Sequence, residues 1–454
     1  MVSLPAALPR VLIIACVCVF ALSAAARGPA ALDPVRWCGT DSASTDRVPD
    51  LASPNVHVIY AFPADGTDRF AERVHQIVND LAAIDLWWRR QDPTRTPRFD
   101  LFTVSGCTTK LGALDISKVR LPQPGAYYAP DTTGAVTGRS RHLRLQDALN
   151  AAPFGFGSPA KKYLGFYDAP TDDSGCAGGT IGRPTTGGPF DYAWVYLGGI
   201  GCPNDLGGRG RSAGIAAHEL VHVLGALPRP FPNPGPPHAC SDQTHVCDSD
   251  TDIIARVAPP LNDRVLDAGH DDYYGHSASW WDVQDSPFLA PQMPLTVTVS
   301  RAEGTSGRVV SEPAGLECQE TCTLGFDQGA SVTLTAEPDA GARLVAWGGA
   351  CSGRANCSVR LDGPQSVTAM FARASFRVAV RISGRGKIRS RPSGILCPAR
   401  CFADFPADAI VRLTATPAKG WRLVRWTGPC RGRGQCAVRV SEDRSVGAKF
   451  ARQP

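Results

Sequence analysis

The stretch RSAGIAAHELVHVLG, Arg211–Gly225, carries the pattern His-Glu-x-x-His at His218, Glu219 and His222. On an α-helix, residues four apart lie one turn above each other, so the two histidines share a face. That spacing lets both imidazoles bind one Zn²⁺, and Glu219 can reach a water on the same metal. Ser212 as N-cap, helix-forming alanines and leucines, and a closing glycine predict a helix over the stretch. The alternative is a buried helix whose histidines are satisfied by hydrogen bonds.

Composition places the chain outside the cytoplasm. Residues 1–26 have the features of a secretory signal, with one arginine, a short apolar core and a closing Ala-Ala-Ala. No later stretch is apolar enough to span a membrane. Of sixteen cysteines, two fall in this segment. The remaining fourteen are expected to form disulfides in an oxidising compartment.

Charge is distributed unevenly along the chain. Residues 372–454 hold eighteen Lys and Arg against four Asp and Glu, a net +14 in a chain whose total is +5. An acidic body with a basic C-terminal part indicates an anionic partner for that part, such as a cell-wall polymer or an acidic glycan. We expect no nucleic-acid partner. The alternative is a basic face that is merely solvated.

The order of expected elements predicts an α+β domain with a mixed sheet. Hydrophobic periodicity indicates strands at 55–63, 98–104, 162–168 and 191–197, and helices at 67–91, 144–151 and 211–225. Strands, a long helix and then a metal-binding helix are the order of a zincin-like catalytic domain. We assign the edge that binds an extended peptide to Tyr192–Leu197, the strand before the metal helix. An ordinary internal strand is the alternative.

Two copies of one module fill the C-terminal part. Cys318, Cys322, Cys351 and Cys357 recur 79 residues later as Cys397, Cys401, Cys430 and Cys436. Short alternating segments in both copies predict strands, and each copy is expected to hold two internal disulfides. The predicted organisation is a signal peptide at 1–26, a zinc metalloprotease-like domain at 27–290, and β-rich repeats at 291–372 and 373–454.

Both halves of the chain resemble known families. VTLTAEPDAGARLVAWGGACSG (332–353) and VRLTATPAKGWRLVRWTGPCRG (411–432) resemble the divergent InlB B-repeat family, which implies extracellular stalk or interaction modules. His218, Glu219, His222 and Gly225 resemble the start of the metzincin pattern H-E-x-x-H-x-x-G-x-x-H of secreted zinc metalloproteases. The pattern's third histidine would fall on Pro228, and no methionine follows where the family's Met-turn should lie; Ile253 or Ile254 is the candidate substitute.

The third zinc ligand must therefore lie further along the chain. No glutamate occurs between Glu219 and Glu303, which argues against a zincin with a glutamate ligand. His238 is the first histidine after the proline-rich segment, and we take it as the third ligand. His245 is the next choice, followed by an aspartate such as Asp242 or Asp250.

Neighbouring features have functional and structural interpretations. Asp248, Asp250 and Asp252 alternate like the start of a calcium loop but lack its glycine, so an acidic turn is preferred. Tyr273 or Tyr274 is a candidate oxyanion donor, and a core tyrosine is the preferred alternative. The segment around Cys38 resembles a cysteine switch, in which a thiolate occupies the fourth zinc position of a latent enzyme. We prefer instead the pairs Cys38–Cys107, Cys176–Cys202 and Cys240–Cys247.

These observations predict a secreted, extracellular zinc endopeptidase acting on peptide or protein substrates, with the basic repeat as a candidate cell-surface attachment. Zn²⁺ is held by His218, His222 and His238, and Glu219 is the general base toward the metal-activated water. The alternative is an extracellular binding or adhesion protein whose zincin-like domain has lost catalysis and whose repeats act instead.

Overall fold

The computed structural model describes residues 34–39, 43–46, 54–129, 140–151, 153–169, 176–198, 211–227, 231, 235–256 and 260–453. Three sequence expectations fall outside this part of the chain: the signal segment 1–26, Pro228, and Cys202 as the partner of Cys176. No helix in the described residues is long and apolar enough to cross a membrane.

A five-stranded mixed sheet forms the centre of the N-terminal part. In spatial order its strands are β3 (Ile116–Arg120), β1 (Asn55–Phe62), β4 (Lys161–Tyr167), β6 (Tyr192–Tyr196) and β5 (Ala177–Gly179). All neighbouring pairs are parallel except β5, which runs antiparallel to β6 at the edge. The four parallel strands are almost wholly buried, as expected for a parallel sheet covered on both faces. The expected mixed sheet is therefore present.

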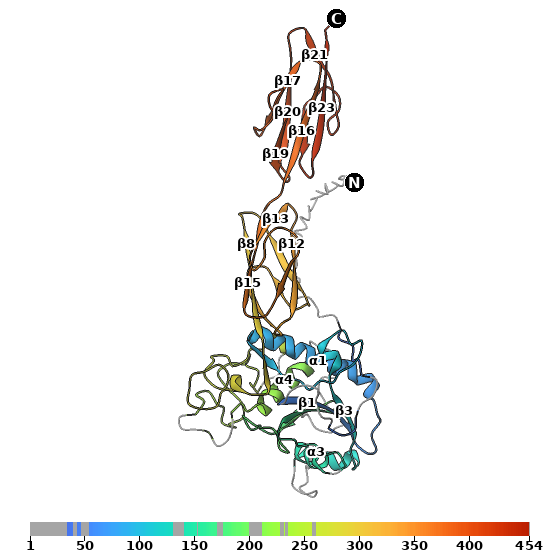
Figure 1. Cartoon of the computed structure of the whole chain (residues 1–454), viewed down its shortest axis with the longest axis vertical. Helices are drawn as coiled ribbons and strands as arrows, with labels where there is room; N and C mark the ends of the chain where they lie inside the picture. Colours follow the sequence, from blue (N-terminus) through green and yellow to red (C-terminus); the bar gives the residue numbers. More distant parts are fainter. Residues whose placement is uncertain are drawn as a thin grey trace, which may run out of the picture. The chain divides into compact units, whose positions relative to one another are not determined.

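Helices cover both faces of this sheet. Helices α1 (Phe70–Gln91) and α4 (Arg211–Val223) share one apolar core with the strands, and α3 (Arg141–Asn150) shares the other. Figure 1 shows α1 and α4 on one side of β1 and β3, with α3 on the opposite side. The remaining short helices are α2 (Gly125–Tyr128), η1 (Lys110–Ala113), η2 (Leu261–Asp263) and η3 (Val283–Asp285).

Two local expectations need correction. Residues 98–104 form only isolated bridges at Phe99 and Leu101, and the strand there is β2 (Arg95–Pro97), which pairs with β7 (Leu289–Pro291). Ser212 lies inside α4, where its hydroxyl donates to buried Asp80 (2.8 Å), so it does not cap the helix.

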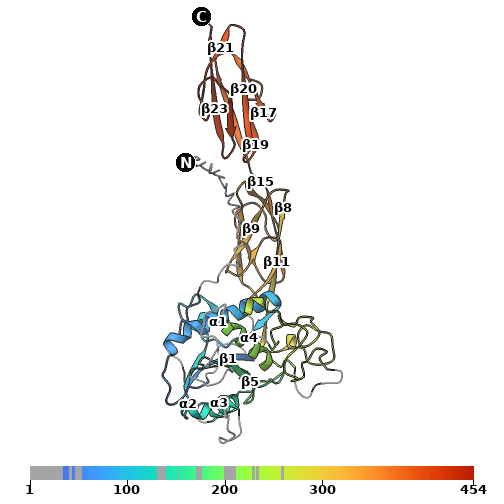
Figure 2. The same ribbon diagram turned by 180° about the vertical axis from the view of Figure 1, so that it is seen from behind.

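Each C-terminal module consists of two four-stranded sheets around one apolar core (Figure 2). The first module contains β8 (Met293–Arg301), β9 (Gly307–Glu312), β10 (Glu317–Cys318), β11 (Thr321–Phe326), β12 (Ser331–Pro338), β13 (Ala342–Gly349), β14 (Cys357–Arg360) and β15 (Gln365–Arg373). The second contains β16 (Ser375–Ser383), β17 (Gly386–Arg391), β18 (Leu396–Cys397), β19 (Phe402–Pro406), β20 (Ile410–Pro417), β21 (Trp421–Thr427), β22 (Cys436–Arg439) and β23 (Arg444–Arg452).

Disulfides follow the expected pairing wherever both cysteines are described. The pairs are Cys38–Cys107, Cys240–Cys247, Cys318–Cys322, Cys351–Cys357, Cys397–Cys401 and Cys430–Cys436. Because Cys38 is paired, it offers no thiolate for a cysteine switch. This many disulfides fit an extracellular protein.

Candidate metal centre

Helix α4 places His218 and His222 side by side. Its apolar residues, including Ala216, Leu220 and Val223, are fully buried against α1 and the sheet, which holds the helix in place. The helix ends because Gly225 has a φ of +108° and lies against Pro184, a position that suits only glycine. The two Nε2 atoms are 3.1 Å apart. Nitrogen ligands 2.0–2.1 Å from a tetrahedral zinc are about 3.3 Å apart, so this spacing fits one shared ion.

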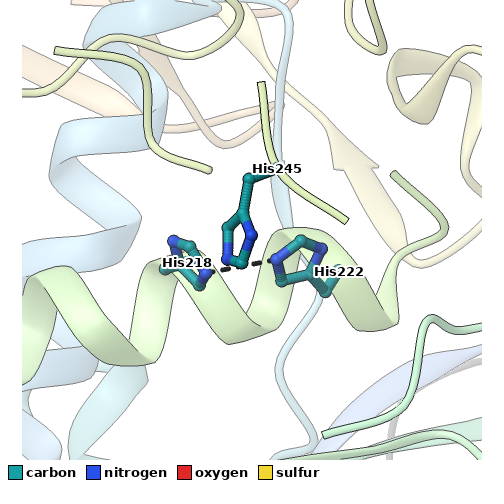
Figure 3. Close-up of side chains that lie close together, drawn as sticks. All are labelled: His218, His222 and His245. Carbon is teal, nitrogen blue, oxygen red and sulfur yellow. Dashed lines mark hydrogen bonds between the residues drawn. The ribbon is translucent and has the colours of Figure 1, made fainter. Parts of the chain in front are cut away.

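His245 completes a group of three imidazoles. Each of His218, His222 and His245 offers a ring nitrogen within 4.8 Å of the other two. The ring of His245 lies 5.4 Å from that of His218 and 5.6 Å from that of His222, between centroids. Figure 3 shows it entering from a separate segment and pointing between the two rings of α4.

The structure does not bring His238, the expected third ligand, to this group and places it with Asp248 and Asp272 instead. The His238 backbone N–H donates to Asp272 (2.9 Å), and its Nδ1 lies 3.2 Å from the other oxygen of that carboxylate. The Cys240–Cys247 disulfide closes a short loop in which the Cys240 N–H donates to the His245 carbonyl (2.7 Å). This turn brings His245 back to α4 and leaves His238 facing the acidic segment.

Hydrogen bonds to the Nδ1 atoms orient two of the three rings. His218 Nδ1 lies 2.8 Å from the Ile253 carbonyl, and His245 Nδ1 lies 2.9 Å from the Asp242 carboxylate. A carbonyl can only accept, so His218 carries its proton on Nδ1 and turns the lone pair of Nε2 to the centre. The carboxylate favours the same tautomer in His245. His222 Nδ1 is buried and has no hydrogen-bond partner among the described residues.

Burial determines the protonation of the centre. It lowers the pKa of His218 to about 3 and that of His222 well below its ordinary value, so both imidazoles are neutral and able to bind metal. Burial also raises the pKa of Glu219 to about 8, because no cationic side chain in the described chain offsets the carboxylate. A bound divalent cation would favour the ionised form of Glu219.

Asp242 supports His245 rather than joining the three imidazoles. Burial alone would raise its pKa, but hydrogen bonds from the Thr244 backbone and the His245 ring hold that pKa below its ordinary value. Arg256 donates to the same carboxylate (2.9 Å). A carboxylate behind a ligating histidine fixes the ring orientation and increases the basicity of the metal-facing nitrogen. Asp250, the other aspartate candidate, is exposed and is not in the group.

Glu219 lies next to the edge strand β5. A Cβ placed on Gly179 would be 3.3 Å from Glu219 Oε2 and 2.7 Å from the Tyr192 carbonyl, so this approach requires glycine. Because Gly178 pairs with Trp194 and the Thr180 N–H donates to the Tyr192 carbonyl, the backbone groups of Ala177 and Gly179 face away from β6. The strand at Tyr192–Leu197 was the wrong choice of edge, because β4 and β5 flank it on both sides.

The remaining candidates have structural partners. Asp252 accepts hydrogen bonds from the Ile254 and Ala268 backbones and from the Tyr273 hydroxyl, all between 2.8 and 2.9 Å. Tyr274 donates to Asp92 (2.8 Å). Both tyrosines are 1% exposed, so they are core residues and not oxyanion donors. Asp248, Asp250 and Asp252 do not form a shared group of ligands in the described chain.

Sequence reasoning missed two parts of the centre. Gly178 and Gly179 have no strand propensity, so β5 gave no signal. The Ile253 carbonyl is a backbone group and cannot be read from a residue type. A signal for His245 was present in the sequence, because it lies between Cys240 and Cys247, which are seven positions apart and form a disulfide.

A protein-family model matches only the C-terminal repeats of this chain. The model of the divergent InlB B-repeat domain matches residues 297–375 and 403–454. A search of curated proteins finds no match. Among solved structures, archaemetzincin from Methanopyrus kandleri is 15% identical, with 46% of this chain and 84% of that chain covered and a TM-score of 0.23. OgpA from Akkermansia muciniphila is 11% identical, with 90% and 98% covered and a TM-score of 0.27.

The TIE protein of Bacillus anthracis also matches, at 10% identity and a TM-score of 0.22. The match covers 36% of this chain and 35% of that one, so the chain spans about a third of the length of the TIE protein. Matches with such low identity and TM-score indicate only a distant likeness to these structures.

Proposed function

We propose that the chain is a secreted zinc endopeptidase whose metal ligands are His218, His222 and His245. The observation that carries the proposal is the convergence of three imidazoles beside Glu219 and the edge strand β5. Three imidazole nitrogen ligands suit Zn²⁺ and leave its fourth position for water or substrate. Zinc bound there would polarise the scissile carbonyl and lower the pKa of a water molecule toward about 7.

Glu219 is the general base in this proposal. Its carboxylate accepts the proton of the attacking water and then delivers it to the leaving amine. Strand β5 holds the substrate, because an extended peptide can hydrogen-bond to the outward backbone groups of Ala177 and Gly179. That position places the peptide beside Glu219 Oε2, which lies next to Gly179.

The Glu219→Gln variant tests the mechanism. It keeps the size of the side chain and removes the base, so hydrolysis of an unfolded protein should fall by about 10²–10⁴-fold. Zinc content, measured by elemental analysis, should stay at one per chain. Unchanged hydrolysis would remove Glu219 from the mechanism. A zinc-free and inert wild-type chain would leave the alternative, an extracellular binding protein that acts through its repeats.

A second candidate function concerns the second repeat, which we propose binds an acidic polysaccharide. Arg381, Arg425 and Lys449 line a shallow depression of about 390 Å³ on the outer face of the β16–β23–β21 sheet. Arg425 lies directly opposite Lys449, and like charges in that position destabilise a sheet. None of the three has an acidic partner within the described residues. A bound polyanion would remove the repulsion.

The first repeat is a natural control for this surface. Its counterparts in the paired strands are Thr298, Ala346 and Met370, so none of these three positions carries a charge there. The residues that line the depression include no aromatic side chain, the group on which single-stranded nucleic acids stack. Hydroxyl groups of Ser383, Thr427 and Ser445 line it instead, and these can bond to sugar hydroxyls.

Exchanging the three cations for their first-repeat counterparts tests the site. The variant Arg381→Thr, Arg425→Ala, Lys449→Met in the full chain should elute from heparin at much lower salt than wild type. The matched control, Arg389→Ala, Arg391→Ala, Arg412→Ala, removes equal charge from the other sheet of the repeat. Equal losses in both variants, or stronger retention on duplex DNA than on heparin and polygalacturonate, would overturn the proposal.

A further inference from the structure

A second group of potential metal ligands lies in the loop of residues 267–274. Asp267, Asp271 and Asp272 each offer a carboxylate oxygen within 4.8 Å of the other two. Asp267 and Asp272 are 2% and 1% exposed, so two of these three charges are removed from water. None of the three belongs to the group of His218, His222 and His245.

The charge of this group is not balanced by the described protein. Asp267 Oδ1 and Asp271 Oδ1 are buried and have no hydrogen-bond partner among the described residues. Among the described residues, the one basic side chain in ion-pair range there is His238, whose Nδ1 lies 3.2 Å from Asp272 and 3.7 Å from Asp271. One imidazole cannot offset three carboxylates, and a buried carboxylate without a partner is costly.

Hydrogen bonds within the loop fix the position of the Asp267 carboxylate. Asp267 Oδ2 accepts the backbone N–H groups of Asp272, Tyr273 and Tyr274, at 3.2, 2.7 and 2.6 Å. These bonds fix the Asp267 side chain and leave its other oxygen unbonded. The Trp280 indole donates to the Asp272 carbonyl (2.8 Å), which anchors the loop on a second side.

From this arrangement we propose a Ca²⁺ site formed by Asp267, Asp271 and Asp272. Carboxylate oxygens are the preferred ligands of this hard cation, and two positive charges offset most of the buried negative charge. Calcium accepts irregular geometry more readily than Mg²⁺, which keeps most of its water. Extracellular calcium sites have dissociation constants of roughly 10⁻⁴–10⁻³ M, so the site would fill in calcium-containing fluids outside the cell.

The site connects to the zinc ligands through a short chain of hydrogen bonds. The Ala268 N–H and the Tyr273 hydroxyl both donate to Asp252, which also accepts the N–H of Ile254. The carbonyl next to it, that of Ile253, accepts from His218 Nδ1. Calcium that orders the 267–274 loop would therefore help to hold the acceptor that orients His218.

Metal binding to the full chain in the inactive Glu219→Gln background tests the site. Elemental analysis after dialysis against calcium should find one Ca²⁺ per chain in addition to zinc. Terbium should bind in competition with calcium and give luminescence excited through Trp280. Asp271→Asn should weaken Ca²⁺ binding tenfold or more and leave the zinc content unchanged. Asp250→Asn, a nearby exposed aspartate outside the group, is the matched control.

Three results would overturn the inference. The first is no calcium binding at millimolar concentration, and the second is calcium binding to Asp271→Asn that is as tight as binding to wild type. Alternatively, the second ion could be zinc that is lost in His238→Ala, which would assign the ligands to His238, Asp248 and Asp272. Asp267→Asn would also disturb the three backbone hydrogen bonds that Asp267 Oδ2 accepts, so loss of calcium in that variant could result from misfolding. Asp271 is partly exposed, so Asp271→Asn should remove a calcium ligand without unfolding the loop.

Discussion

At the scale of single residues, the centre depends on which nitrogen of each histidine faces inward. The Ile253 carbonyl and the Asp242 carboxylate occupy the Nδ1 atoms of His218 and His245 and leave both Nε2 atoms free for metal. Residue type alone does not distinguish His245 from His238, because both are histidines in an acidic segment. Their partners distinguish them, since His238 is already bonded through its backbone and its ring to Asp272.

Removing His245 should therefore weaken zinc binding, whereas removing His238 should leave it nearly unchanged. His245→Ala removes one of three ligands, and zinc affinity should fall by at least 100-fold, measured by competition with a chromogenic chelator. His238→Ala should retain one zinc per chain with affinity within about threefold of wild type. Loss of zinc in His238→Ala with retention in His245→Ala would restore the original assignment.

Zinc binding should release a proton from Glu219, because burial raises the pKa of that carboxyl group. In the metal-free centre its pKa is about 8, so at pH 7 the carboxyl group is mostly protonated. A bound cation favours the carboxylate, and zinc binding at pH 7 should release close to one more proton from wild type than from Glu219→Gln. At pH 9 the group is already ionised before zinc binds, so the difference should vanish. Calorimetry in buffers of different ionisation enthalpy measures both values, and equal release at pH 7 would contradict the expectation.

At the scale of elements, the short strand β5 is the edge that the proposed mechanism assigns to the substrate. It lies at the end of the sheet order, next to β6, and approaches Glu219 through a position that holds no side chain. Its antiparallel pairing turns the backbone groups of Ala177 and Gly179 outward. A three-residue strand is thus sufficient to present hydrogen-bonding groups beside Glu219.

Replacing one of these outward groups should weaken substrate binding without loosening the sheet. Ala177→Pro removes an N–H that faces away from β6, and a proline is tolerated on an edge strand for that reason. One lost hydrogen bond of about 1–1.5 kcal/mol should lower kcat/KM for an extended peptide by about tenfold. Ala177→Val keeps the N–H and is the control. If both variants lose activity equally, the side chain and not the backbone is responsible.

At the scale of the whole molecule, separate apolar cores hold the parts of the chain. The residues around the five-stranded sheet, those of the first repeat and those of the second form distinct clusters, and each repeat has two disulfides of its own. The charge is also separated, because the excess of arginine and lysine lies in the second repeat. The parts are therefore expected to respond independently to metal and to reductant.

Differential scanning calorimetry should show this independence. Zinc present at 1,000 times its dissociation constant stabilises the part that binds it by about 4 kcal/mol. A chelator should lower the Tm of that part and leave the transition of the second repeat unchanged. Reductant should lower the Tm of the repeats, whose small cores depend on cross-links. A single transition that shifts as a whole under both treatments would show that the parts unfold together.

The sequence by itself determined the features that depend on local spacing. Helix α4, the pairing of its two histidines, the long helix α1 and the repeated modules all follow from periodicity, and nearby cysteines indicated the correct disulfides. In these cases the interacting residues are close along the chain, so their pattern carries the information.

Only the tertiary structure decided which distant groups meet the helix. His245 reaches α4 because a disulfide turns its loop back, and the Ile253 carbonyl reaches His218 across 35 residues. Strand β5 was not predicted, because its glycines take strand geometry from β6 and not from their own propensity. The proposed third ligand and the proposed substrate edge both depend on long-range contacts. Chain topology selects among chemically equivalent residues there, and no local pattern records that choice.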